Sequence, residues 1–320
     1  MVAYDLVEQH DPPWGIARIS NSSLAAEAVV NGYANGTATY RYDSSAGDGV
    51  TAYVLDTGVN LEHDEFEGRA EFGTNTVGGP NEDSYGHGTH VAGTIAGKTF
   101  GVAKKASIIS VKVLDSRGYG TNSGVIAGVE WMAQHARKHG GKAVANLSLG
   151  GSFSAALNAA VEAVIREGIT FGVAAGNEDV DAVNSSPASV AAAITVGATD
   201  PDDSRAAYSN YGSIVDIFAP GTGVKSAWIG STTATKTLSG TSMACPHVVG
   251  LAAYLIALED LQSPADVVQR MKALALPGIV TNPGADTVGN LAYNGADGGG
   301  SDNYTLSGLT TRQLRWYTLY

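Results

Sequence analysis

The chain has 320 residues, of which 44% are hydrophobic and 41 are glycine, and its formal net charge is −12. This length and apolar content allow a large core, and one α/β domain is the simplest organisation, although the length would also permit two domains. The acidic balance argues against a nucleic-acid partner, because such affinity rests on phosphate neutralisation by Lys and Arg. No uninterrupted apolar run reaches the roughly 20 residues that span a bilayer, so we expect no membrane segment.

The first 49 residues are rich in Asn, Ser, Gly and Tyr and show little periodicity. We therefore predict an N-terminal segment that lies over the surface of a later core and is anchored there by Trp14. Cys245 is the only cysteine, which excludes an intrachain disulfide and leaves the redox compartment open.

From residue 50 onward, strand-like and helix-like runs alternate, which is typical of a parallel sheet with crossover helices. The expected strands are 51–55, 107–113, 143–148, 170–174, 193–196 and 214–218. The expected helices are 123–138, 155–167, 243–258 and a short one ending at 272, with a further helix-like segment after His87. Ser263 and Pro264 form a helix-start signal for the short helix that ends at 272.

A glycine-rich stretch, residues 295–301, has the composition of a flexible linker. It predicts a division into a catalytic domain, 1–295, and a tail, 296–320, to which we assign no role. Three interpretations of the tail stay open: an added remnant, an extension that packs on the body, or a peptide that visits the active-site cleft.

Three separated motifs carry the chemistry. Ser242 stands in Gly240-Thr241-Ser242-Met243-Ala244, at a glycine-preceded corner before an apolar run. A serine hydroxyl is a poor nucleophile unless a base takes its proton. His87, flanked by glycines, is the candidate base, and Asp56, at the end of an apolar strand, is the candidate carboxylate that orients it. Ligands of open parallel sheets sit at the carboxyl ends of strands, where Asp56 is expected.

Each member of this set has a competitor. His90 follows His87 by three residues, but zinc-binding helices place their histidines four apart with a glutamate after the first, so we do not predict zinc. Asp83 is an alternative orienting carboxylate. Gly118-Tyr119-Gly120 begins a glycine-containing loop whose spacing does not match a dinucleotide fingerprint.

The three motifs, in the order Asp, His, Ser, resemble those of the subtilisin-like serine proteases, and the adjoining sequence is most similar to the proteinase K-like branch. The resemblance runs from Pro13 to Asn294. It implies a subtilisin-like three-layer α/β fold with a mostly parallel central sheet. It also implies a serine endopeptidase in which His87 is the general base, Ser242 forms an acyl-enzyme, and His90 is a buried structural residue.

In the family that the chain resembles, the asparagine matching Asn177 donates its side-chain amide to the oxyanion, beside the backbone N–H of Ser242. The resemblance further places an extended peptide between two edges, Gly118-Tyr119-Gly120 and Ser148-Leu149-Gly150. Small residues leave space for a large apolar or aromatic side chain before the scissile bond, with broad specificity; they are Gly150, Ala174, Ala175 and Gly176.

Calcium is the ion that the resemblance implies, held by the carboxylate of Asp216 and by backbone carbonyls near Pro187, since Ca²⁺ prefers hard oxygen ligands. The resemblance also implies an N-terminal prodomain that assists folding and is removed, a monomer that acts on polypeptides, and a secreted enzyme, or alternatively a vacuolar one. An unmodified histidine pKa near 6.5 predicts activity that rises through neutral pH.

Two other functions remain as alternatives. A catalytically silent peptide-binding module would bind without cleavage. An esterase of the α/β-hydrolase type is disfavoured because the order of the three residues differs and no nucleophile elbow is found.

Overall fold

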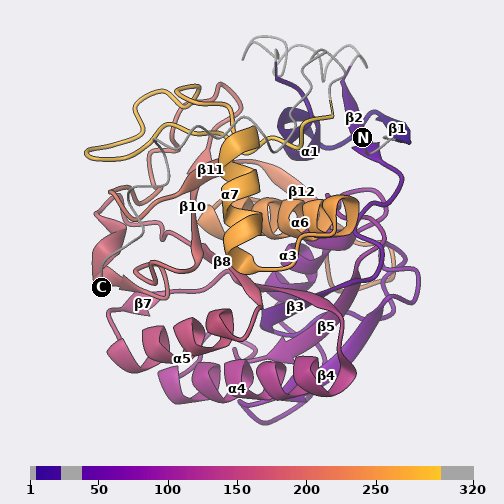
Figure 1. Cartoon of the computed structure of the whole chain (residues 1–320). Coiled ribbons are helices and arrows are strands. Elements are labelled where there is room, and N and C mark those ends of the chain that lie inside the picture. The colour runs from indigo at the N-terminus through magenta and orange to yellow at the C-terminus, as the bar shows by residue number, and fades with distance from the viewer. Residues whose placement is uncertain (1–4, 23–37, 297–320) are drawn as a thin grey trace.

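A central sheet of seven parallel strands organises the computed structural model, which describes residues 5–22 and 38–296 (Figure 1). Its spatial order is β11, β10, β8, β6, β3, β5, β4. In that order the strands are Ile217–Pro220, Ile194–Thr199, Thr170–Ala174, Lys142–Leu147, Val50–Asp56, Ser107–Lys112 and Ala70–Asn75. The central strands are apolar on both faces, as expected for a parallel sheet with helices on both sides.

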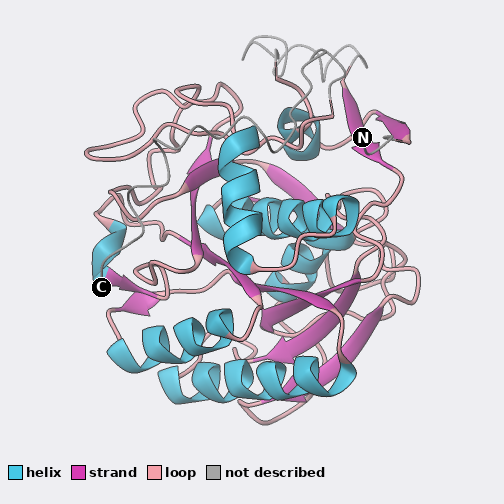
Figure 2. Ribbon diagram, viewed as in Figure 1, coloured by secondary structure: helices cyan, strands magenta, loops and turns pink. Residues whose placement is uncertain are grey.

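Helices cover both faces of this sheet (Figures 1 and 2). On one face, α3 (His87–Ala96) and α6 (Thr241–Glu259) pack in one hydrophobic cluster, and α7 (Pro264–Leu274) lies against α6. On the other face, α4 (Asn122–His139) and α5 (Ala155–Arg166) form a second cluster. The predicted three-layer α/β architecture is confirmed.

Helix α6 runs through the middle of the molecule. It is 19 residues long with a mean hydropathy of 1.5 over its most apolar window, and among the described residues it is the one helix with the length and composition of a membrane span. However, 83% of that window is buried inside the fold. It packs against five strands and α3 as a core helix, so its composition reflects burial on all sides.

The N-terminal segment differs from the sequence prediction. Strands β1 (Leu6–His10) and β2 (Thr39–Asp43) form an antiparallel pair, and the short helix α1 (Trp14–Ile19) between them is buried. Trp14 anchors the segment as predicted, because its indole Nε1 donates to the carbonyl of Thr222 at 3.1 Å. The prediction of a surface segment is wrong for α1, where Arg18 forms a buried bidentate pair with Asp203.

The last described residues return to this segment. The backbone N–H of Asn294 donates to Ile19 and its side-chain amide donates to the carbonyl of Arg41, each at 2.8 Å. The last described residues are therefore joined to α1 and β2 by hydrogen bonds. The predicted tail, 296–320, lies outside the described residues except for Ala296, and the domain boundary at 295 stays a prediction.

Most predicted elements lie within a few residues of those observed, but the strand expected at 214–218 is shifted to Ile217–Pro220 because Gly212 and Val215 form a turn first. Several short elements had no sequence signal. These are the edge strand β4, the antiparallel pair β12 (Val224–Ala227) and β13 (Thr235–Leu238), the pair β7 (Gly151–Ser152) and β9 (Ser185–Ser186), and the 3-10 turn η1 (Ala182–Asn184).

Candidate active site

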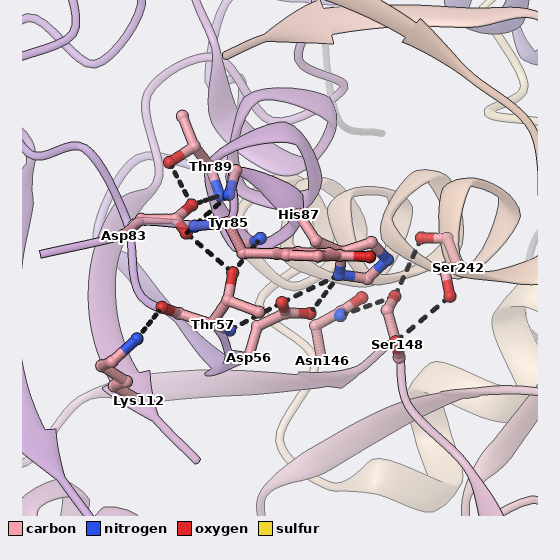
Figure 3. Close-up of polar contacts among 12 residues, drawn as sticks. Asp56, Thr57, Asp83, Tyr85, His87, Thr89, Lys112, Asn146, Ser148 and Ser242 are labelled. Atoms are coloured by element: carbon pink, nitrogen blue, oxygen red, sulfur yellow. Dashed lines mark hydrogen bonds and ion pairs between the residues drawn. The ribbon is translucent and has the colours of Figure 1, made fainter. Parts of the chain in front are cut away.

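The candidate residues meet at the carboxyl edge of the sheet (Figure 3). Asp56 is the last residue of β3, and Asn177 follows β8 by three residues. His87 opens helix α3, and Ser242 is the second residue of α6. Ligand sites of parallel sheets form at this edge, so the topology gathers residues that are up to 186 positions apart in the sequence.

The closest contact is between Asp56 and His87. His87 Nδ1 lies 2.8 Å from Oδ1 and 2.9 Å from Oδ2 of Asp56, whose side chain is fully buried. Burial by itself lowers the pKa of His87, but the charge and hydrogen bond of Asp56, with the charge of Asp83, outweigh it and raise the pKa above the ordinary 6.5. The carboxylate therefore stabilises the imidazolium and favours the tautomer with its proton on Nδ1.

The glycines on either side of His87 are required by geometry. Gly86 has φ +101°, and a Cβ there would lie 2.5 Å from the Trp228 ring. A Cβ on Gly88 would lie 2.1 Å from the carbonyl oxygen of Gly58. Helix α3 can therefore bring His87 onto Asp56 only because both neighbours lack a side chain.

The Ser242 hydroxyl donates to the carbonyl of Ser148 at 3.1 Å, and in the described part of the chain it makes no hydrogen bond to His87. Figure 3 shows the His87 ring with Asp56 on one side and Ser242 on the other. A rotation about the Ser242 side chain would be needed to direct the hydroxyl to the imidazole. Catalytic contacts are often long or misaligned without substrate.

A second bond between the same two residues has a cause inside α6. Pro246 has no N–H, so the carbonyl of Ser242, four residues earlier, lacks its helical donor. The hydroxyl of Ser148 donates to that carbonyl at 2.9 Å, and Asn146 in turn donates to Ser148 at 2.9 Å. The proline thus lies beyond the first turn of α6, and the carbonyl that it leaves free helps to link Ser242 to the end of β6.

Asn177 is exposed and its orientation is determined by Thr241. The backbone N–H and the hydroxyl of Thr241 both donate to Asn177 Oδ1, at 2.8 and 3.0 Å, and the hydroxyl accepts from Gly176. Because Oδ1 faces these donors, Nδ2 is the end that remains available as a donor beside Gly240. Sequence reasoning found Asn177 but missed Thr241.

His90 has no role of this kind. It is completely buried, its Nε2 lies 3.1 Å from the carbonyls of Val224 and Lys236, and burial lowers its pKa to about 4. It is therefore a neutral packing residue in the folded protein. In the described residues, no three His, Cys, Asp or Glu side chains gather as a metal site.

The two predicted substrate edges are accessible in part. Tyr119 is 72% exposed, Gly150 is exposed, and no described strand pairs with 118–120 or 148–150. By contrast, Ala174 and Ala175 are only 5% and 0% exposed and pack in the core. Of the four small residues expected to leave space, Gly150 and Gly176 are the accessible ones.

The predicted calcium ligands lie near each other, linked by Thr195. Its N–H donates to Asp216 Oδ2 at 3.0 Å, and its hydroxyl donates to the carbonyl of Ala188, beside Pro187, at 2.8 Å. The oxygen set fits a hard cation, but Asp216 Oδ1 already contacts the ammonium of Lys272 at 2.9 Å. Any metal at Asp216 would have to displace Lys272, whose side chain is half exposed.

Comparisons with known proteins agree with this arrangement. Residues 47–300 match the subtilase family. The chain is 55% identical over 283 residues to subtilisin-like protease 2 of Pseudogymnoascus destructans, covering 88% of this chain and 67% of that protein. It is 48% identical over 293 residues to the cuticle-degrading protease of Metarhizium anisopliae, covering 91% and 72%. A crystal structure of a cold-adapted subtilisin-like serine proteinase superposes with a TM-score of 0.81 at 44% identity, over 90% of this chain and all of that one.

These matches define the class of protein as a serine endopeptidase. The chain belongs to the subtilase family, and its relatives lie in the proteinase K-like branch, as the sequence motifs indicated.

Proposed function

We propose that Asp56, His87 and Ser242 form the catalytic triad of this endopeptidase. His87 takes the proton of Ser242 as the hydroxyl attacks the scissile carbonyl, the leaving amine receives that proton, and water hydrolyses the acyl-enzyme by the same route. The observation that supports this most is the contact of His87 Nδ1 with both oxygens of the buried Asp56 carboxylate.

Asn177 Nδ2 and the backbone N–H of Ser242 would together stabilise the oxyanion of the tetrahedral intermediate. Support comes from the orientation of the amide by Thr241 and from the position of Ser242 at the start of α6, where backbone N–H groups have no helical partner. We further propose that an extended substrate binds between 118–120 and 148–150. A large apolar or aromatic residue would precede the scissile bond, beside Gly150 and Gly176.

The experiment is hydrolysis of a chromogenic peptide with phenylalanine before the scissile bond, with and without a serine-directed sulfonyl fluoride, followed by intact mass. We expect inhibited cleavage and one adduct, which is absent from Ser242→Ala. We expect kcat to fall by on the order of 10⁴-fold or more in both Ser242→Ala and His87→Ala. This is the scale known for subtilisin itself, a member of this family. Cleavage at wild-type rate by either variant would reject the triad.

Calcium binding at Asp216 and at carbonyls near Pro187 is also proposed, with Lys272 moving into solvent when the metal binds. The support is the convergence of carboxylate and carbonyl oxygens around Thr195. Bound metal would stabilise this corner of the fold and take no part in the reaction.

From family membership alone, we propose that the enzyme is made with an N-terminal prodomain, is secreted rather than vacuolar, and acts as a monomer. Sedimentation of the active enzyme tests the monomer, and fractionation of the producing culture tests secretion. A dimer, or activity confined to the cells, would reject the corresponding proposal.

A further inference from the structure

Asp83 is a buried carboxylate that the proposed chemistry does not use. It is 6% exposed and precedes His87 by four residues. It was weighed above as an alternative partner for the imidazole, but His87 Nδ1 bonds to Asp56 instead. A buried charge is retained at low cost only where hydrogen bonds replace its hydration, so its partners indicate its role.

Five donors surround Asp83, and three of them belong to the start of the helix that carries His87. The backbone N–H of Gly86 donates to Oδ1 at 2.8 Å, and the N–H and hydroxyl of Thr89 donate to Oδ2 at 3.0 and 2.6 Å. The N–H of Tyr85 also donates to Oδ1. Asp83 therefore caps the N-terminus of α3, where a negative charge is favourable.

The fifth donor belongs to the other catalytic segment. The hydroxyl of Thr57 donates to Asp83 Oδ1 at 2.9 Å, and the N–H of Thr57 donates to Asp56 Oδ1 at 2.7 Å. The same hydroxyl accepts the N–H of Gly88 at 3.0 Å. The Thr57 side chain, next to Asp56, thus contacts Asp83 before His87 and Gly88 after it (Figure 3).

We propose that Asp83 is a positioning residue for catalysis, whose carboxylate holds the end of β3 and the start of α3 in the register that brings Asp56 onto His87. The inference rests on the triad proposed above. A misplacement of about 1 Å costs up to about a hundredfold in rate, so a residue that sets this register affects turnover without touching substrate.

The charge of Asp83 has a second effect. The ionisable groups around His87 are Asp56 on β3, Asp83 before α3, His90 on α3 and Lys112 on β5, whose ammonium bonds to the carbonyl of Thr57. Asp83 is one of the two carboxylates that raise the pKa of His87. Removing its charge should move the acid limb of the rate profile to lower pH.

The test uses Asp83→Asn in the full chain, with kcat and KM for the chromogenic peptide measured from pH 5 to 9 and corrected by active-site titration. We expect kcat to fall about tenfold with KM little changed, and the acid limb to move to lower pH. Asp203→Asn is the matched control, since it removes another buried carboxylate, paired with Arg18, and should lower Tm without moving the acid limb.

Thr57→Val and Thr57→Ser leave the charge of Asp83 in place. They therefore separate its positioning effect from the effect of its charge on the pKa of His87. Valine removes both hydrogen bonds of the hydroxyl and should lower kcat severalfold, while serine preserves them and should restore it. The Thr57 pair carries the test if Asp83→Asn does not fold. The inference is overturned if Asp83→Asn folds with unchanged kcat and acid limb, or if Thr57→Val matches wild type. Activity in Ser242→Ala would instead reject the triad.

Discussion

The two halves of the candidate active site are built in opposite ways. Around His87, ionisable groups are buried and hydrogen-bonded: Asp56 is 0% exposed, Asp83 is 6% and Lys112 is 2%. Around Ser242, the side chains that contact the serine segment are neutral, those of Ser148, Thr241 and Asn177, and Asn177 is exposed. The difference fits the proposed mechanism, in which buried charged groups stabilise the protonated His87 and an exposed neutral amide is available to the substrate oxygen.

Outside the proposed triad, the largest expected effect comes from replacing Asn177, the exposed donor. Asn177→Ala should leave KM nearly unchanged and lower kcat by at least about a hundredfold, or about 3 kcal/mol, a magnitude taken from the corresponding asparagine of subtilisin, a family member. Steady-state kinetics with the chromogenic peptide measures both constants.

Thr241→Val is the matched control for that variant. It removes one of the two bonds that orient the amide and keeps the backbone N–H, so a smaller loss is expected. Unchanged turnover in Asn177→Ala would remove the oxyanion role.

The groups around His87 should determine how activity depends on pH. In the proposed triad, His87 can accept a proton only when neutral, and its pKa lies above 6.5 because the carboxylates outweigh burial. Activity should therefore be lost as pH falls through a midpoint above 6.5, which is higher than the unmodified histidine predicts. A profile of kcat/KM against pH measures this midpoint, and a value at or below 6.5 would contradict the electrostatic account.

The pair of Lys272 and Asp216 offers a comparison with the buried pair of His87 and Asp56, since its cation is half exposed and free to leave. Lys272→Gln should bind calcium more tightly. A tenfold gain in affinity is worth about 1.4 kcal/mol and raises Tm by roughly 3 °C in a chain of this size. Thermal melts in calcium and in chelator measure the difference.

Two variants control this experiment. Asp216→Asn should abolish the response to calcium, and Lys225→Gln, an exposed charge removed elsewhere, should leave it as in wild type. An equal calcium response in wild type and Lys272→Gln would show that the lysine does not compete.

The smallest effect is expected at Cys245, three residues after Ser242 on α6. Its thiol is fully buried and burial raises its pKa, so it is almost entirely protonated. Cys245→Ala should keep kcat/KM within about twofold, and it should lose the inhibition by mercurials that we expect in wild type, where mercury on Cys245 would crowd Ser242. An inhibition assay checks this, and equal mercury sensitivity in both proteins would refute it.

The sequence predicted what local patterns determine. Strand 170–174 has the predicted bounds, and the apolar run before Asp56 placed that residue correctly at a strand end. Strand β4 was missed because its exposed residues and Gly73 interrupt any apolar pattern, and only pairing with β5 defines it.

The supporting contacts of the site could not be predicted from the sequence either, because they join residues that are far apart in the chain. Asp83 meets Thr57 across 26 positions, and Ser148 meets Ser242 across 94. One signal was available: Asn146 interrupts an apolar strand, and a buried amide in such a place indicates a polar network around it.

The hydrogen bonds from Asn294 to Ile19 and Arg41 have a consequence for an enzyme that digests polypeptides, because each molecule is also a potential substrate for its neighbours. Proteolysis begins where a chain opens locally, and chain ends open most easily. Here the last described residues cannot separate from α1 and β2 without breaking the two bonds of Asn294. We therefore expect these bonds to oppose local opening of α1, β2 and the segment around Asn294, and so to slow cleavage there by a second molecule of the enzyme.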